Sequence, residues 1–310
     1  GFMWNPKPVH PGASAWATLA DPKVWLAAAG QIFFTLSIGF GVIINYASYL
    51  KPKDDIVLSA TTASATNEFF EVCLGGLITI PAAFLFLGIA GASQGTFGLG
   101  FNTLPIVFQY MPAGQFFGFL WFFMLFLAAI TSSLSLLQPV IAFLEEALNI
   151  GRRGSVTILA AVTVLGNLFV IYFSNGLAAL DTLDFWMAQV GILIFGAIEL
   201  VLLAWVFGAR RGHAIALVGA ELHAPRWIFT VLMRFITPAL LLVVLVAWCV
   251  FYARGYVDAI RQGGVPAYSV AVILGLLVFF LILVYLADRR WGAIRREEQR
   301  GFPEIVEEQP

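Results

Sequence analysis

Hydrophobic residues fill long, nearly continuous runs along this chain, and short polar or Gly- and Pro-containing stretches separate them. A run of about twenty apolar residues is long enough to cross a bilayer core of ~30 Å as an α-helix. The pattern predicts spans at about 23–50, 57–90, 114–148, 155–174, 180–207, 226–253 and 268–287. We therefore predict an all-α polytopic membrane protein with seven spans.

The segments outside these runs complete the predicted organisation. Residues 1–20 are expected to form an extracellular loop, residues 91–113 an outer loop with short helices, and residues 291–310 a charged, unstructured cytoplasmic tail. Most basic residues fall in one set of loops, which the positive-inside rule assigns to the cytoplasm. The protein is thus expected in the plasma (inner) membrane, with its amino end outside and its carboxyl end inside. An outside amino end without a signal peptide predicts that upstream spans are missing.

Composition narrows the classes of function. Of the 310 residues 60% are hydrophobic and only 11% charged, which fits lipid as the main surroundings. The net charge of −1 gives no reason to expect a nucleic-acid partner. Cys73 and Cys249 lie in apolar runs and are interpreted as small hydrophobic residues. No catalytic triad, zinc spacing or nucleotide-binding loop is present in the sequence, so we expect neither an enzyme nor an organic cofactor.

The first span carries polar and small residues at its centre, namely Gln31, Thr35, Ser37, Gly39 and Gly41. Glycines weaken a helix at a depth where no water can replace lost hydrogen bonds. One interpretation is a helix broken at mid-membrane, with the gap facing a binding site. The other is a continuous helix whose small residues pack against a neighbour.

The second span contains two acids and an amide, and the third contains hydroxyls. Asn67 and Glu71 are four residues apart and share one helix face, with Glu68 beside them. An amide oxygen and a carboxylate suit a hard cation, and intramembrane acids favour a functional role over simple helix–helix bonding. On the third span, one face carries residues that suit an all-oxygen cation site or merely bond back to their own helix, namely Ala128, Thr131, Ser132 and Leu136.

Other charged residues near membrane depth are harder to interpret. Asp184 begins the fifth span, Glu145 and Glu146 end the third, and Glu199 lies in the middle of the fifth. An interfacial charge explains Glu145 well, whereas Glu199 needs a partner that the sequence does not identify.

Several motifs together resemble the sodium-coupled neurotransmitter and amino-acid symporters, in particular those like the bacterial leucine transporter. The resemblance rests on Gln31-Ile-Phe-Phe-Thr-Leu-Ser-Ile-Gly-Phe-Gly, Asn67-Glu-Phe-Phe-Glu-Val, Gly98-Leu-Gly-Phe-Asn-Thr-Leu-Pro, Thr131-Ser-Ser and Asp184-Phe-Trp. These motifs resemble spans 6, 7, 8 and 10 and an outer loop of that family. The resemblance implies an inverted-repeat fold with an unwound helix at the binding site, and it implies that spans 1–5 are absent from this chain.

The resemblance also implies roles for individual residues. Substrate contacts are expected from Phe34, Thr35, Ser37, Phe40, Ser132 and Leu136. Two sodium sites are expected in the complete protein, with ligands from Thr35, Asn67, Ala128, Thr131 and Ser132. Gln31 and Glu71 fall where chloride-dependent members hold chloride, so the carboxylate is expected to replace that ion. Asp184 and Glu146 match the outer and inner gate acids.

The function implied is sodium-driven symport of a neutral apolar amino acid, independent of chloride, by alternating access. The expected partners are the amino-acid substrate, the bilayer and the missing amino-terminal spans of the same protein. Three alternatives remain at this point. A seven-span receptor would have the same outline without a missing half. A channel would show unsaturated flux far above transporter turnover, and an inactive fragment would have no activity of its own.

Overall fold

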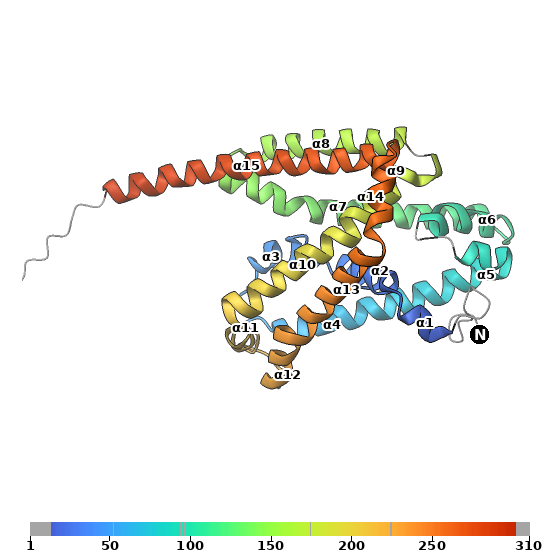
Figure 1. Ribbon diagram of the computed structural model, residues 1–310, viewed down its shortest axis with the longest axis horizontal. Helices are drawn as coiled ribbons and strands as arrows, with labels where there is room; N and C mark the ends of the chain where they lie inside the picture. Colours follow the sequence, from blue (N-terminus) through green and yellow to red (C-terminus); the bar gives the residue numbers. More distant parts are fainter. Residues whose placement is uncertain are drawn as a thin grey trace, which may run out of the picture.

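The computed structural model describes residues 14–301, apart from 52, 94, 96, 174 and 224. The described part is helical (Figure 1). Its α-helices are α1 Ala15–Leu19, α2 Pro22–Thr35, α3 Val42–Ala47, α4 Ile56–Glu68, α5 Leu77–Ala92, α6 Leu104–Gln109, α7 Gly114–Leu148, α8 Arg152–Tyr172, α9 Ala178–Asp184, α10 Ile192–Val201, α11 Ala209–Ala216, α12 Arg226–Val231, α13 Thr237–Phe251, α14 Ala253–Arg261 and α15 Val265–Gly301.

Wider π-helical turns join several of these helices into longer rods. They are Phe69–Gly76 between α4 and α5, Gly98–Thr103 before α6, Phe185–Gly191 between α9 and α10, Leu202–Gly208 between α10 and α11, and Leu232–Ile236 between α12 and α13, with a 3-10 turn at Asn175–Leu177. Counting these turns, six described rods are long and apolar enough to cross a membrane: Ile56–Ala92, Gly114–Leu148, Arg152–Tyr172, Asn175–Ala216, Arg226–Phe251 and Val265–Gly292. The protein is a multi-pass membrane protein.

One helical group forms around α2, the first half of the broken first span. Asp21 accepts a hydrogen bond from the backbone N–H of Lys23 and Pro22 follows it, which together start α2. Leu26 of α2 then packs against Leu193 of α10 and Trp248 of α13 in one buried cluster. This packing holds α2 between α10 and α13, near the centre of Figure 1.

A second group consists of α7, α8 and α15, which run along one edge of the molecule in Figure 1. Leu144 of α7 and Leu159 of α8 are buried together, and Phe280 and Leu283 of α15 cover them. Elsewhere these helices are largely exposed, with large apolar side chains such as Leu134 (65%) and Leu165 (68%) on the surface. Exposed apolar surface on this scale fits contact with lipid or with other membrane helices.

The chain near residue 301 differs from the expectation of an unstructured tail. Helix α15 continues through the charged stretch as far as Gly301, and residues 302–310 lie outside the described part. Because Arg, Glu and Gln are strong helix formers, a helix already stabilised by packing extends readily into such a stretch. The prediction of disorder was therefore wrong for residues 291–301. Residues 1–13 of the predicted extracellular loop also lie outside the described part.

The start of α4 is fastened to the loop between α11 and α12. One carboxylate oxygen of Asp55 accepts the backbone N–H of Leu58 at 2.8 Å and caps the helix. The other accepts the backbone N–H of Glu221, 166 residues away, at 2.7 Å. These two bonds, that to Glu221 first, lower the pKa of Asp55 from its ordinary value.

We expect Asp55→Asn to release this loop while keeping the helix cap. The amide oxygen can still accept the N–H of Leu58, but the NH2 group cannot accept the N–H of Glu221. Amide hydrogen exchange over residues 217–223 should therefore quicken several-fold, with the start of α4 still protected. Glu221→Gln is the matched control because only the backbone of Glu221 takes part.

The same contact should weaken in acid. Because folding lowers the pKa of Asp55, its stabilising effect is complete above the ordinary carboxyl pKa and is lost as the pH falls through the lower folded-state value. Exchange over residues 217–223, corrected for its intrinsic pH dependence, should rise in that acidic range in the parent chain but not in Asp55→Asn. Equal pH profiles for the two chains would contradict this assignment.

Candidate functional site

The first predicted span is broken at the place that its sequence indicates. Helix α2 ends at Thr35 and α3 begins at Val42. Between them Ser37, Gly39 and Gly41 have φ angles of 57°, 80° and 73°, which are left-handed and cannot continue a right-handed helix. The structure thus confirms the unwound helix and excludes the continuous alternative.

The unwound backbone finds hydrogen-bond partners on two sides. The N–H of Ile38 donates to the carbonyl of Phe33 at 2.8 Å, within the same segment. The N–H of Gly39 donates to the carboxylate Oε2 of Glu199 on α10 at 3.2 Å. Glu199 thereby gains the partner that the sequence could not identify, because the two residues are 160 positions apart. A carboxylate acceptor offsets the cost of leaving a backbone N–H unpaired at this depth.

The unwound segment also lies directly against the backbone of α10. A Cβ atom added at Gly39 would stand 3.1 Å from the carbonyl oxygen of Ile192 and 3.2 Å from the nitrogen of Gly196. One added at Gly196 would stand 2.6 Å from the ring of Phe33. Glycine is required at both positions because any side chain would push the two elements apart.

On its other side, the end of α2 joins the second predicted span through a polar network. The amide Nε2 of Gln31 donates to Oε1 of Glu71 at 2.5 Å. The amide Nδ2 of Asn67 donates to the hydroxyl oxygen of Thr35 at 3.1 Å and to Oε2 of Glu71 at 3.3 Å. The structure therefore brings Gln31, Thr35, Asn67 and Glu71 together. Glu71 lies on the π-helical segment Phe69–Gly76, a kind of turn that is frequent at functional sites.

Two aromatic rings flank the break. The ring centres of Phe34 and Phe40 are 5.8 Å apart, in an edge-to-face arrangement with an interplanar angle of 75°. Phe34 is the last residue but one of α2 and Phe40 lies in the unwound segment, so the left-handed residues between them fold one ring back onto the other. An apolar surface thus lies next to the polar network.

The hydroxyl face of α7 lies apart from this network in the described part of the chain. Thr131 donates its hydroxyl to the carbonyls of Leu127 and Ala128, at 3.0 and 3.1 Å. Ala128, Ser132 and Leu136 are exposed on the same helix. Helix α7 meets the broken span through α3, where the hydroxyl of Tyr46 donates to that of Ser135 at 2.8 Å.

Asp184, which is predicted to be the outer gate acid, lines a hollow of 630 Å³ at the other end of α2. Asp184 lines it together with Asp181, Lys23 and Trp248. The amino group of Lys23 lies 4.2 Å from the ring centre of Tyr252.

Near this hollow, the start of α2 is tied to the end of α13. The hydroxyl of Tyr252 donates to Asp21 at 2.8 Å. The backbone N–H of Lys23, followed by this hydroxyl, lowers the pKa of Asp21, and the same carboxylate raises the pKa of Tyr252. This pair could not be predicted from the sequence, since 231 residues separate its members.

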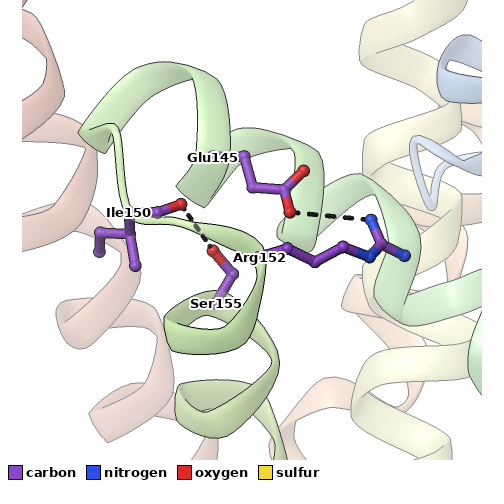
Figure 2. Close-up of polar contacts among 4 residues, drawn as sticks. All are labelled: Glu145, Ile150, Arg152 and Ser155. Carbon is purple, nitrogen blue, oxygen red and sulfur yellow. Dashed lines mark hydrogen bonds and ion pairs between the residues drawn. The ribbon is translucent and has the colours of Figure 1, made fainter.

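Glu146, which is predicted to be the inner gate acid, lies in the last turn of α7, and its neighbour Glu145 makes the charged contact. Glu145 faces Arg152 at 3.7 Å, and the hydroxyl of Ser155 donates to the carbonyl of Ile150 at 3.2 Å (Figure 2). The side chain of Glu146 is exposed. Arg290 of α15 donates to the backbone carbonyls of residues 146 and 147, at 3.4 and 3.0 Å, and so ties the end of α7 to α15.

The sequence of this chain is similar to those of known transporters. A family model described as the sodium:neurotransmitter symporter family matches residues 13–290. An uncharacterised sodium-dependent transporter of Haemophilus influenzae is 36% identical over 155 residues, which make up 50% of this chain and 33% of that protein. The human sodium- and chloride-dependent neutral and basic amino acid transporter B(0+) is 28% identical over 289 residues, which make up 87% of this chain and 43% of that protein.

A solved structure is similar as well. The crystal structure of MhsT in complex with L-phenylalanine matches with a TM-score of 0.62 and 26% identity, over 76% of this chain and 54% of that one. The chain thus spans between 33% and 54% of the length of these three proteins.

We expect Gly39→Ala to destabilise the protein by about 1–2 kcal/mol, because alanine at a positive φ is strained and its Cβ would press against the backbone of α10. The free energy of unfolding in detergent micelles measures the effect. Gly275→Ala in α15 is the control, since nothing lies within 4 Å of an added Cβ there. That change should be neutral or stabilising by up to ~1 kcal/mol. Equal stability of the two variants would mean that Gly39 is not held as described.

Proposed function

The chain belongs to the sodium:neurotransmitter symporter family, and on that premise we propose that it forms part of a sodium-driven symporter of a neutral, apolar amino acid. The observation that carries this proposal is the polar network at the end of α2. There an unwound helix, an amide and a carboxylate meet at one place. A seven-span receptor is disfavoured by the family match.

In this proposal the network is where one sodium ion binds as a co-substrate. Na⁺ prefers hard oxygen ligands, which the hydroxyl of Thr35 and the amide oxygen of Asn67 supply. The NH2 group of Asn67 now points at Thr35, so a half-turn of the amide would present its oxygen on the same side. The carboxylate of Glu71 beside them supplies fixed negative charge.

The pairing of Gln31 with Glu71 supports independence from chloride. A carboxylate held at this position balances the charge of sodium in the way that a bound anion would. The amide of Gln31 would then serve to orient that carboxylate.

The substrate is proposed to lie at the unwound segment. A break in a helix leaves partly charged backbone ends, which suit the amino and carboxylate groups of an amino acid. Thr35, the backbone of Ser37 and Ser132 would contact these polar groups. Phe34 and Phe40 pack together beside them and, with Leu136, would form the apolar wall.

The second sodium site, the two gates and the membrane orientation are proposed from the family resemblance. A second sodium site would use the carbonyl of Ala128 and the hydroxyls of Thr131 and Ser132, whose oxygens keep lone pairs for a cation while Thr131 donates to its own helix. Asp184 and Glu146 would close the outer and inner gates. The amino end would lie outside and the carboxyl end in the cytoplasm of the plasma membrane, with amino-terminal spans completing the site.

A sodium gradient should drive uptake by the complete protein in liposomes. We expect accumulation of a labelled apolar amino acid when sodium is higher outside, and none when potassium replaces it. Replacing chloride by gluconate should leave uptake unchanged, because Glu71 supplies the negative charge. Uptake that ignores the sodium gradient would refute the proposal, whereas a strict need for chloride would refute only the role of Glu71.

Individual members of the network should set the affinity for sodium. Asn67→Ala removes an oxygen ligand and Glu71→Gln removes the fixed charge, so each should raise the half-saturating sodium concentration for substrate binding roughly tenfold or more. Glu68→Gln is the matched control, since it removes an exposed carboxylate from the same helix. If Glu68→Gln had the same effect as Glu71→Gln, the charge would act at long range and the assigned site would be wrong.

A further inference from the structure

The ends of two membrane rods meet at one corner of the molecule, where helices α11 and α12 pack against each other (Figure 1). The rod Asn175–Ala216 ends with α11, and the rod Arg226–Phe251 begins with α12. Both therefore reach the same face of the membrane. The residues that line this corner are not part of the polar network at the end of α2, so an inference about them does not rest on the function proposed above.

A shallow hollow of 580 Å³ opens at this corner. It is lined by Arg210 of α11 and by Arg226, Trp227, Thr230 and Val231 of α12. The hydroxyl of Thr230 donates to the carbonyl of Arg226 at 2.8 Å, which fixes the first turn of α12. The hollow thus combines two guanidinium groups with an apolar wall.

Neither arginine of the hollow has an acidic partner among the described residues. The ion pairs among the described residues lie elsewhere and join Arg152 to Glu145 and Arg261 to Asp258. Asp55, the carboxylate fastened to the adjoining loop, already accepts two backbone N–H groups. Neither guanidinium group of the hollow therefore takes part in an ion pair with a described carboxylate.

Two exposed tryptophans, Trp227 in the hollow and Trp205 on the neighbouring rod, are typical of residues at the level of the lipid headgroups. Trp227 is 70% exposed, and Trp205 is 60% exposed while its indole N–H donates to the carbonyl of Arg234 at 3.0 Å. Tryptophan concentrates at membrane–water interfaces, because its ring prefers the apolar side and its N–H the polar side. Arginine near such an interface pairs with phosphate oxygens through two parallel hydrogen bonds.

We propose that the hollow lined by Arg210, Arg226, Trp227, Thr230 and Val231 binds the phosphodiester headgroup of an anionic glycerophospholipid from the surrounding bilayer. The two guanidinium groups take the phosphate, and Trp227 with Val231 contacts the glycerol and the upper acyl chains. The bilayer is the source rather than free phosphate, because a shallow site open to water would hold a small ion only weakly, whereas a lipid also contributes apolar contact.

The test titrates the full chain, purified in a neutral detergent, with a phosphatidylglycerol and counts bound lipid by native mass spectrometry. We expect Arg210→Gln and Arg226→Gln each to lower the affinity roughly tenfold, as for a lost charge-assisted hydrogen bond. Arg211→Gln is the matched control, since this exposed arginine is next in the same helix but does not line the hollow. It should change the affinity by about fivefold at most, the effect of one arginine near an anionic surface.

Two further measurements distinguish a bilayer lipid from free phosphate, and a pair of Lys substitutions distinguishes lost binding from misfolding. Phosphatidylcholine should bind far more weakly than phosphatidylglycerol, and inorganic phosphate at equal concentration should not compete. Arg210→Lys combined with Arg226→Lys keeps both charges and should retain the fold, with an affinity between those of the parent and of a variant that combines Arg210→Gln with Arg226→Gln. The proposal is overturned if Arg211→Gln weakens binding as much as Arg210→Gln, if both lipids bind equally, or if inorganic phosphate displaces the lipid.

Discussion

The structure depends on the hydrogen bonds that the peptide groups between Thr35 and Val42 make inside the membrane, where little water is available to replace them. An unwound stretch inside a membrane helix loses its own hydrogen bonds, and each unpaired group is costly there. The chain meets this cost with the carboxylate of Glu199 on one side and with tight turns inside the segment. Close approach of Gly39 to α10 makes the carboxylate bond possible. The break is therefore a structured element that other helices hold in place.

The two sides of the break have different chemistry, and this difference is the basis of the proposed transport cycle. On the α10 side the contacts are backbone against backbone with one half-buried acid, so α2 and α10 are expected to move as one body. On the α4 side the contacts are side chains that can exchange partners, namely Gln31, Thr35, Asn67 and Glu71. An ion entering this second group would replace hydrogen bonds by coordination, which changes the geometry there and leaves the α10 side intact.

The sequence predicted features that arise from local spacing. Left-handed positions at Gly39 and Gly41 follow from the residue type, and the shared face of Asn67 and Glu71 follows from the helix period. Contacts between distant segments could not be predicted in this way, as the bonds of Glu199 to Gly39 and of Asp55 to Glu221 illustrate. The π-helical turn that carries Glu71 leaves no mark on apolar periodicity. The ligand face of α7 stays a prediction, because family resemblance alone assigns it.

The length of α15 has a mechanical consequence. Its 37 residues make a rod of about 55 Å, whereas the apolar layer of a bilayer is ~30 Å thick. Arg290 of this rod donates a hydrogen bond to the end of α7. Figure 1 shows α15 continuing past every other helix. We therefore expect the far end of α15, beyond Gly292, to extend past the apolar layer. A small tilt of the α7–α15 pair would be magnified there, so a fluorescent reporter attached near residue 301 would register rocking that is too slight to detect within the membrane.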